Sequence, residues 1–254
     1  MKILISNDDG IDSPGIYALA QELKKIGEII VVAPRTEQSA VGHSITMKIP
    51  VRVTEYFHHA DFFGFAVDGT PADCIKMGIK NILKTPPDIV VSGINNGANS
   101  AINIIYSGTV SAAREAAIMD VPSIAVSVAS HDVKDYSYAA KISAKIVKMT
   151  LRNSLKTGTL LNVNIPDIPE SEIAGIKFTS QGKTKWDDVY EERIDPYGKK
   201  YYWLTGKMTN EDSDEYSDHG AVLKNYVSIS PIHFDLTDYE MLEKIKNWNL
   251  DEIL

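Results

Sequence analysis

Apolar runs alternate with segments of helical spacing through the first two-thirds of the chain. Runs that are apolar in consecutive positions are typical of strands buried on both faces of a parallel sheet; they occupy residues 3–5, 28–33, 89–91, 122–128 and 160–165. Apolar residues at helical spacing predict helices over residues 14–26, 70–83, 109–119 and 134–152. Residues 44–57 and 62–67 show β-branched alternation and are expected to be extended. This order predicts an α/β fold with a doubly wound, mostly parallel sheet.

The pattern changes after Pro166. Residues 175–208 are rich in Tyr, Trp and charge around a turn at 195–198, so we expect a long projecting hairpin arm. We expect a solvated acidic loop over 210–218, a strand over 226–230 and a terminal helix over 238–248. We interpret 1–254 as a single domain, with an α/β core at 1–170 and an oligomerising part at 171–254.

Aromatic residues crowd the expected arm, which carries Trp186, Tyr190, Tyr197, Tyr201, Tyr202 and Trp203. That is too much aromatic surface for a free monomer. We therefore expect a homo-oligomer, at least a dimer, although Tyr201, Tyr202 and Trp203 could instead stack on a nucleobase.

Composition excludes several classes of protein. The 254 residues are 44% hydrophobic with a formal net charge of -8, and no basic stripe is visible, so duplex nucleic acid is not an expected partner. No apolar run approaches the roughly 20 residues of a membrane span. The single cysteine, Cys74, allows neither an intrachain disulfide nor a cysteine-based zinc site. We expect a cytoplasmic protein.

Two adjacent carboxylates, Asp8 and Asp9, directly follow the first strand. In open α/β sheets, ligands bind at the carboxyl ends of the strands. Two carboxylates held together there favour a cation between them. The alternative is a turn without a ligand, because Asn-Asp-Asp-Gly is also good turn chemistry.

Other oxygen donors follow neighbouring strands. Ser39 lies in the loop after the second strand, and Asn95 follows the strand at 89–91. Two carboxylates, a hydroxyl and an amide oxygen form a set that suits magnesium, manganese or calcium. Taken alone, Ser39 is better interpreted as an ordinary loop serine.

Ser107, Gly108 and Thr109 open the helix expected at 109–119. A helix N-terminus offers unpaired N–H groups, and glycine lets an anion approach the backbone. A metal beside an anion cradle is the layout of phosphoryl chemistry. A plain N-cap is the alternative interpretation of Ser107.

Several stretches, taken in order, resemble the SurE survival-protein family of metal-dependent nucleotidases over nearly the whole chain. They are residues 5–10, 32–34 with Ser39, 69–74, 91–95, 106–110, 192–196 with 201–203, and 230–233. The resemblance implies a Rossmann-like domain with a C-terminal arm exchanged between subunits, forming a dimer or tetramer. It implies hydrolysis of nucleoside monophosphates by metal-activated water, with one Mg²⁺ or Mn²⁺.

The resemblance also assigns residues. It implies metal ligation by Asp8, Asp9, Ser39 and Asn95, catalysis by Asp8 and Asp9, and phosphate binding by Ser107, Gly108 and Thr109. The chain departs from the family pattern at 99–103, where Ala101 replaces a usual glycine and Asn103 a usual aspartate.

Two functions from different classes stay open. The first is a metal-dependent phosphohydrolase that acts on nucleoside monophosphates, and the second is a non-catalytic nucleotide- or phosphate-binding module. A covalent aspartyl-phosphate enzyme would want Asp-x-Asp, whereas the acids here are adjacent.

Overall fold

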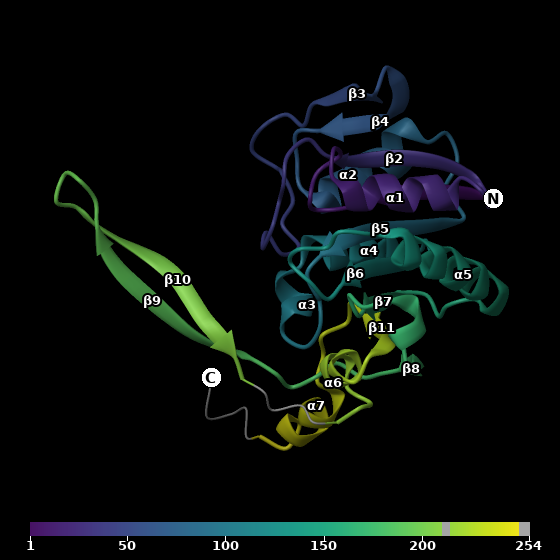
Figure 1. Cartoon of the computed structure of the whole chain (residues 1–254). Helices are drawn as coiled ribbons and strands as arrows, with labels where there is room; N and C mark the ends of the chain where they lie inside the picture. Colours follow the sequence, from purple (N-terminus) through teal and green to yellow (C-terminus); the bar gives the residue numbers. More distant parts are fainter. Residues whose placement is uncertain (210–213, 249–254) are drawn as a thin grey trace.

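The computed structural model describes residues 1–209 and 214–248. Within them, nine strands form one sheet in the order β3-β4-β2-β1-β5-β6-β7-β11-β8 (Figure 1). The bounds are β1 (Lys2–Ser6), β2 (Glu28–Pro34), β3 (Val53–His58), β4 (Asp61–Val67), β5 (Ile89–Asn96), β6 (Ser123–Val128), β7 (Thr159–Ile165), β8 (Gly175–Phe178) and β11 (Tyr226–His233). The expected α/β, Rossmann-like fold is confirmed.

In the parallel part of the sheet, the strand order switches sides between β1 and β5. From β1 the chain adds β2 and then β4 on one side, and later adds β5, β6 and β7 on the other. The point where the strand order reverses is where open α/β sheets bind ligands. Asp8 and Asn95 stand at the carboxyl ends of the two strands that flank this point.

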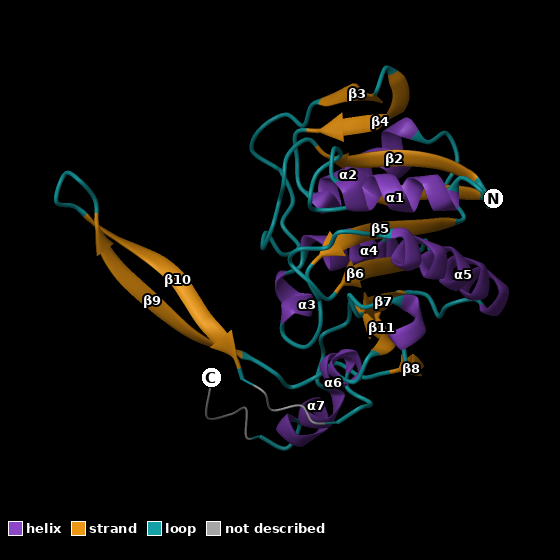
Figure 2. Cartoon of the chain, viewed as in Figure 1, coloured by secondary structure: helices purple, strands orange, loops and turns teal. Residues whose placement is uncertain are grey.

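Helices cover both faces of the sheet (Figure 2). Helices α1 (Pro14–Leu23) and α5 (Ser137–Asn153) pack together on one face, and α2 (Pro71–Met77) and α4 (Gly108–Ile118) pack together on the other. Each pair encloses a separate apolar cluster with the strands. A third, smaller cluster joins α3 (Asn103–Tyr106) and α4 to the sheet. The alternation of sequence patterns therefore corresponds to apolar clusters on both faces of one sheet.

Local chemistry sets where the helices begin. Thr70 accepts a hydrogen bond from the backbone N–H of Asp73, whose carboxylate accepts one from the N–H of Thr70, so α2 starts in a capping box after Gly69 and before Pro71. Ser107 caps α4 by accepting from the N–H of Val110 at 3.0 Å. Because α2 follows β4 and α4 comes after β5, both helices start at the carboxyl edge of the sheet.

Several expected boundaries are wrong. Residues 44–52 form no strand, and the helix expected to reach Leu83 becomes a π-helical turn over Gly78–Ile82. The loop expected after residue 91 continues as strand to Asn96 and contains the short helix α3 (Asn103–Tyr106). Residues 175–178 are not part of the arm, because they form β8 at the edge of the main sheet.

The C-terminal third also departs from the sequence-based expectation around Asp218. Part of the expected acidic loop, 210–213, lies outside the described residues, while Asp218 begins a helix, α6 (Asp218–Leu223). The terminal helix α7 is Tyr239–Ile245, and a 3-10 turn covers Glu170–Glu172. Strand β11 runs antiparallel to β7, so the segment before it returns to the carboxyl edge.

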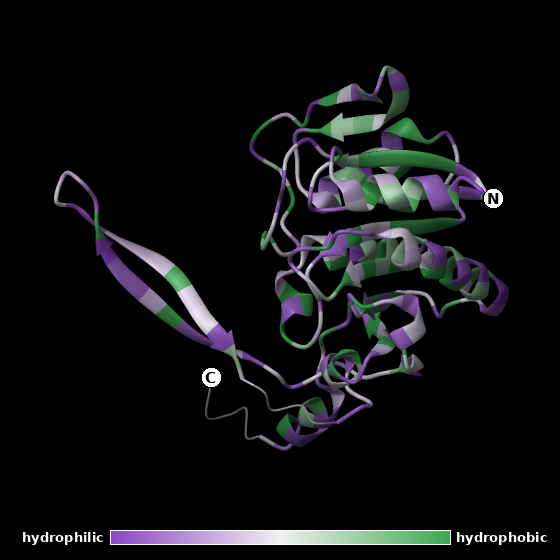
Figure 3. Cartoon of the chain, in the orientation of Figure 1, coloured by the Kyte–Doolittle hydropathy of each residue, from purple (hydrophilic) through white to green (hydrophobic). Residues whose placement is uncertain are grey.

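The hairpin arm consists of β9 (Trp186–Ile194) and β10 (Lys200–Met208), which pair only with each other among the described residues. It projects away from the sheet (Figure 1) and mixes polar and apolar residues along its length, whereas the central strands are mainly apolar (Figure 3). Most of its side chains are exposed. In the described part of the chain, none of the helices is long and apolar enough to cross a membrane.

Candidate active site

Asp8 lies in the turn after β1 and is buried against the start of α4. Its carboxylate accepts hydrogen bonds from the hydroxyl of Thr109 and from the backbone N–H groups of Gly108 and Thr109. A Cβ on Gly108 would stand 2.7 Å from Cβ of Asp8, so only glycine fits this approach. Burial raises the pKa of Asp8, and the hydrogen bonds from residues 108 and 109 oppose that rise.

Asp9 is less buried and stands on the side of β5. Its carboxylate accepts a hydrogen bond from the backbone N–H of Asn96. Burial raises its pKa to about 7, assisted by the negative charges of Asp8 and Glu37. No lysine, arginine or histidine forms an ion pair with Asp8 or Asp9 within the described residues. The two carboxylates therefore form a site that lacks a protein counter-ion.

Ser39 is on a loop that touches this turn, but its side chain does not reach the carboxylates. The N–H of Gln38 donates to the backbone carbonyl of Asp8 at 2.8 Å, which fixes the loop beside the turn. The hydroxyl of Ser39 is exposed and donates to Glu37 at 2.5 Å. Glu37 is thus a neighbour of the site that the sequence alone did not indicate.

Asn95 directly follows the buried part of β5, which ends at Ile94, and precedes Asn96. Its amide nitrogen donates to the backbone carbonyl of Gly97 at 2.6 Å. This hydrogen bond uses the nitrogen of the amide, so the amide oxygen is the candidate ligand atom at the edge of the sheet. The sequence predicted Asn95 but gave no sign that Asn96 would supply the N–H to Asp9.

Three buried side-chain oxygens close to the turn after β1 have no hydrogen-bond partner among the described residues. They belong to Ser6, Asn7 and Ser92, and Ser6 at the end of β1 is in register with Ser92 in β5. Unpartnered buried oxygens are costly. Two carboxylates without a counter-ion, next to an amide oxygen of Asn95, fit a hard divalent cation.

The candidate ligand set differs from metal sites built on acids, histidines and cysteines. Over residues 1–209 and 214–248, no three such side chains gather in a way that could hold an ion. Asp8 and Asp9 supply only two, so Ser39 and Asn95 are needed to extend the set. That these four residues bind a metal stays a prediction.

The loop of residues 35–52 is fastened to the helices beside the site. The N–H of Thr46 donates to the carboxylate of Asp73 at 3.0 Å, and His43 Nε2 lies 2.8 Å from a carboxylate oxygen of Glu115. Lys76 pairs with the other oxygen of Glu115. Burial acts to raise the pKa of Glu115, but the hydrogen bonds and charges of His43 and Lys76 lower it overall. Glu115 is therefore the buried anchor of this loop, a role that the sequence alone did not indicate.

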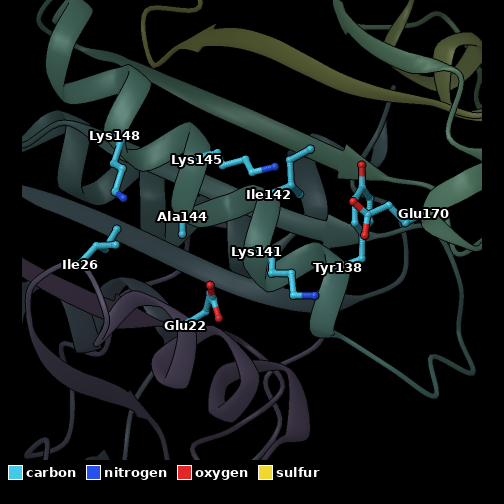
Figure 4. Close-up of a pocket in the computed structure, with 9 residues that line it drawn as sticks. All are labelled: Glu22, Ile26, Tyr138, Lys141, Ile142, Ala144, Lys145, Lys148 and Glu170. Atoms are coloured by element: carbon cyan, nitrogen blue, oxygen red, sulfur yellow. The ribbon is translucent and has the colours of Figure 1, made fainter.

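Two hollows in the described part of the chain contain none of Asp8, Asp9, Ser39 and Asn95. A cavity of about 250 Å³ lies between α1 and α5, where Lys141, Lys145 and Lys148 stand near Glu22 and Glu170 (Figure 4). It contains none of the predicted site residues. A hollow of about 410 Å³ lies beside the Ser39 loop at the ends of β2 and β4, and its lining includes Thr36, Gln38 and Thr70.

Comparisons with known proteins place the chain in a family. The family model described as "Survival protein SurE" matches residues 3–188. The chain is 50% identical to a protein from Alkaliphilus metalliredigens named "5'-nucleotidase SurE", over 99% of this chain and 100% of the relative. It is 46% identical to a protein of the same name from Chlorobium limicola, over 98% and 97% of the two chains.

A solved structure is similar as well. The crystal structure of the SurE protein from Aquifex aeolicus matches with a TM-score of 0.85 at 43% identity, and the match covers 97% of this chain and 98% of that one. The family match covers most of the chain, and the full-length relatives and the structural neighbour carry the same family name. This chain belongs to the SurE survival-protein family.

Proposed function

We propose that this chain is a 5′-nucleotidase, a phosphoric monoester hydrolase that releases phosphate from nucleoside monophosphates. One observation carries the proposal: at the point where the strand order reverses, the Asp8 carboxylate is held by the first turn of α4, beside Asp9. Relatives that match almost the whole chain are named 5′-nucleotidases. The family and this juxtaposition support the same chemistry.

In this proposal, Asp8 and Asp9 hold one divalent cation, Mg²⁺ or Mn²⁺, with Ser39 and Asn95 extending the set. The unpartnered oxygens near the strand ends fit such an ion. When bound, the cation supplies positive charge next to the phosphate and makes water a better nucleophile at neutral pH. Ser39 would have to turn away from Glu37 to take part.

The protein's own residues bind and orient the substrate. The start of α4 at Ser107, Gly108 and Thr109 places the positive end of the helix at the site, which favours a phosphate dianion. The N–H groups of Gly108 and Thr109 donate to Asp8 in this structure and would have to turn to the phosphate to contact it directly. Asp9 orients the attacking water, a new P–O bond forms to that water oxygen, and the P–O bond to the nucleoside oxygen breaks. A proton of the water ends on the nucleoside oxygen, so the products are the nucleoside and inorganic phosphate.

Chelation tests the metal requirement. Hydrolysis of an aryl phosphate should stop when the protein is treated with EDTA and dialysed, and should return with added Mg²⁺ or Mn²⁺. Full activity after thorough chelation would overturn the metal assignment. Binding of a nucleoside monophosphate without turnover, in the presence of either metal, would favour the non-catalytic binding module.

Substrate class needs a separate measurement with metal present. A panel of nucleoside monophosphates, cyclic nucleotides, sugar phosphates and short polyphosphate should show turnover of several ribo- and deoxyribonucleoside monophosphates. The site has no base-reading code that we recognise, so we expect breadth across bases. Exclusive turnover of a diester or of a sugar phosphate would contradict the nucleotidase proposal.

Assembly is the third part of the proposal. The arm exposes Tyr190, Tyr197, Tyr202 and Trp203, all more than half exposed, on a two-stranded ribbon. An isolated two-stranded hairpin is marginal in water. We propose a homo-oligomer, a dimer or tetramer, with exchanged arms. A fully active monomer by light scattering at micromolar concentration would contradict it. A cytoplasmic location stays a prediction.

A further inference from the structure

Asp218 is a fully buried carboxylate that the proposed reaction does not use. It accepts backbone hydrogen bonds from three separate segments: from Ala101 at 3.1 and 3.0 Å to its two oxygens, from Gly182 at 2.9 Å and from His219 at 2.7 Å. Among the described residues, no lysine or arginine forms an ion pair with it.

Burying a carboxylate costs free energy unless hydrogen bonds satisfy its oxygens. Burial raises the pKa of Asp218, and the N–H groups of Ala101, Gly182 and His219 oppose that rise. The contacts join the loop after β5, the start of the arm segment and the first turn of α6. Asp218 therefore ties together parts of the chain that are far apart in the sequence.

The same C-terminal part forms further hydrogen bonds with residues 100–103. Gln181 donates to the carbonyl of Ala101 at 2.9 Å, and the indole N–H of Trp186 donates to the side-chain oxygen of Asn103 at 2.7 Å. The hydroxyl of Ser100 lies 3.3 Å from Nδ1 of His219. Ala101 adopts φ 52°, a left-handed conformation that alanine avoids without support.

A short path leads from this segment to the phosphate-binding turn. Helix α3 begins at Asn103, and the carbonyl of Asn103 accepts from the N–H of Ser107 at 3.0 Å. Ser107 caps α4, whose next residues contact Asp8. Only one four-residue helix thus separates the anchored Ala101 from the turn.

We infer that Asp218 is a positioning residue for phosphate binding: by holding the backbone of Ala101 against the segment that leads into the arm, it fixes α3 and hence the turn at Ser107, Gly108 and Thr109. The inference rests on the proposed function, because the turn is taken to bind the substrate phosphate. It adds a residue from the C-terminal part to the determinants of substrate affinity.

Asp218→Asn is the sharpest test because it keeps the size of the side chain. The amide oxygen can still accept from Gly182, from His219 and from Ala101 at the longer of its two contacts. The amide nitrogen would replace the second acceptor of Ala101 with a donor that faces its N–H. We expect KM for a nucleoside monophosphate to rise roughly tenfold while kcat changes by less than about threefold, since a turn that binds phosphate in the ground and transition states contributes uniform binding. The Kd of inorganic phosphate for the metal-loaded protein should rise by a similar factor.

Trp186→Phe supplies a second variant in case Asp218→Asn does not fold. It removes the N–H that donates to Asn103, together with the five-membered ring that carries it. A smaller rise in KM in the same direction is expected. Asp88→Asn is the matched control, because exposed Asp88 accepts the N–H of Lys2 at 2.7 Å at the opposite edge of the sheet. It should leave KM and the phosphate Kd unchanged.

The outcomes separate the inference from the function. Unchanged KM and phosphate Kd in folded Asp218→Asn and Trp186→Phe, with an active wild-type enzyme, would overturn the inference alone. A fall in kcat at constant KM would also overturn it, because that pattern indicates loss of folded enzyme rather than a displaced turn. An inactive wild-type protein on every phosphomonoester would overturn the proposed function, while the phosphate Kd would still test the positioning of the turn.

Discussion

The hydroxyl of Thr109 donates a hydrogen bond to the carboxylate of Asp8, and this bond joins the turn after β1 to the first turn of α4. Both groups are buried, with Thr109 fully enclosed. The bond occupies one oxygen of Asp8, so the geometry of the carboxylate depends on a residue 101 positions further along the chain.

Replacing Thr109 with valine tests this relationship. Valine keeps the shape but leaves a buried carboxylate oxygen without its partner, which should lower the free energy of unfolding by about 1–3 kcal/mol. Phosphatase activity should fall with it. Thr109→Ser retains the hydroxyl and should stay close to the wild type. Urea unfolding and a rate assay measure both effects, and equal behaviour of the two variants would contradict the role given to the hydroxyl.

Asp9→Asn removes a charge at nearly constant volume. We expect turnover to fall by at least roughly a hundredfold, the scale of a lost general base or electrostatic element. Asp12→Asn is the control, because Asp12 is an exposed acid in the same turn. Near-normal turnover and metal affinity in Asp9→Asn would mean that Asp9 serves the turn and not the reaction.

The Glu115 network should make stability depend on pH in a defined sense. The pKa of Glu115 is lower in the folded protein than its usual value, because its hydrogen bonds to His43 and Lys76 and their charges outweigh burial. The ionised form therefore contributes stability that is fully present above the unfolded-state pKa and is lost as the pH falls through the folded-state pKa.

Glu115→Gln should accordingly lower Tm at pH 7 and approach the wild-type Tm in acid. Differential scanning calorimetry from pH 7 to about pH 3, where an unperturbed Glu with a pKa of ~4.3 is protonated, follows the difference. Asp132→Asn removes the acid of an exposed pair with Lys134 and should have little effect at any pH. A Tm difference that does not shrink in acid would exclude the charge of Glu115 as its source.

Ala101 occupies the left-handed region that the usual family glycine would tolerate. That conformation costs an L-residue about 1–2 kcal/mol in the folded state. Glycine in turn lowers the free energy of unfolding by about 0.4–1 kcal/mol, because its unfolded chain has more conformational entropy. Ala101→Gly should therefore raise the free energy of unfolding by up to roughly 1 kcal/mol. Ala98→Gly, in the same loop but without a positive φ, should lower it. Thermal unfolding of both variants is the measurement, and destabilisation by Ala101→Gly would show that the strain is absent.

The sequence was most informative where burial and local chemistry act together. The buried strands and the caps at Thr70 and Ser107 follow from apolar runs and from residues that satisfy their own backbone, so they could be predicted with the fold. The extension of β5 to Asn96 and helix α3 could not, because both depend on partners in other segments, such as Ser127 opposite Asn95.

The site divides in the same way. Asp8 and Asp9 are visible as adjacent acids after a strand, but the role of Glu115 depends on Lys76 and on His43, which lies 72 residues away in the sequence. Asp218 fell at the end of a stretch that resembles a solvated loop, and its burial is set by the return of β11. Contacts between distant segments leave no local pattern to read.

The antiparallel direction of β11 has a consequence for how the molecule is completed. A parallel strand in that position would have left the preceding helix at the far edge of the sheet, whereas the reversed strand brings Asp218 to the loop of Ala101. Because synthesis begins at the N-terminus, Asp8, Asn95 and Thr109 are made long before Asp218. A polypeptide that stops short of Asp218 would contain every predicted ligand yet lack the contact that we infer to fix the turn at Ser107, Gly108 and Thr109.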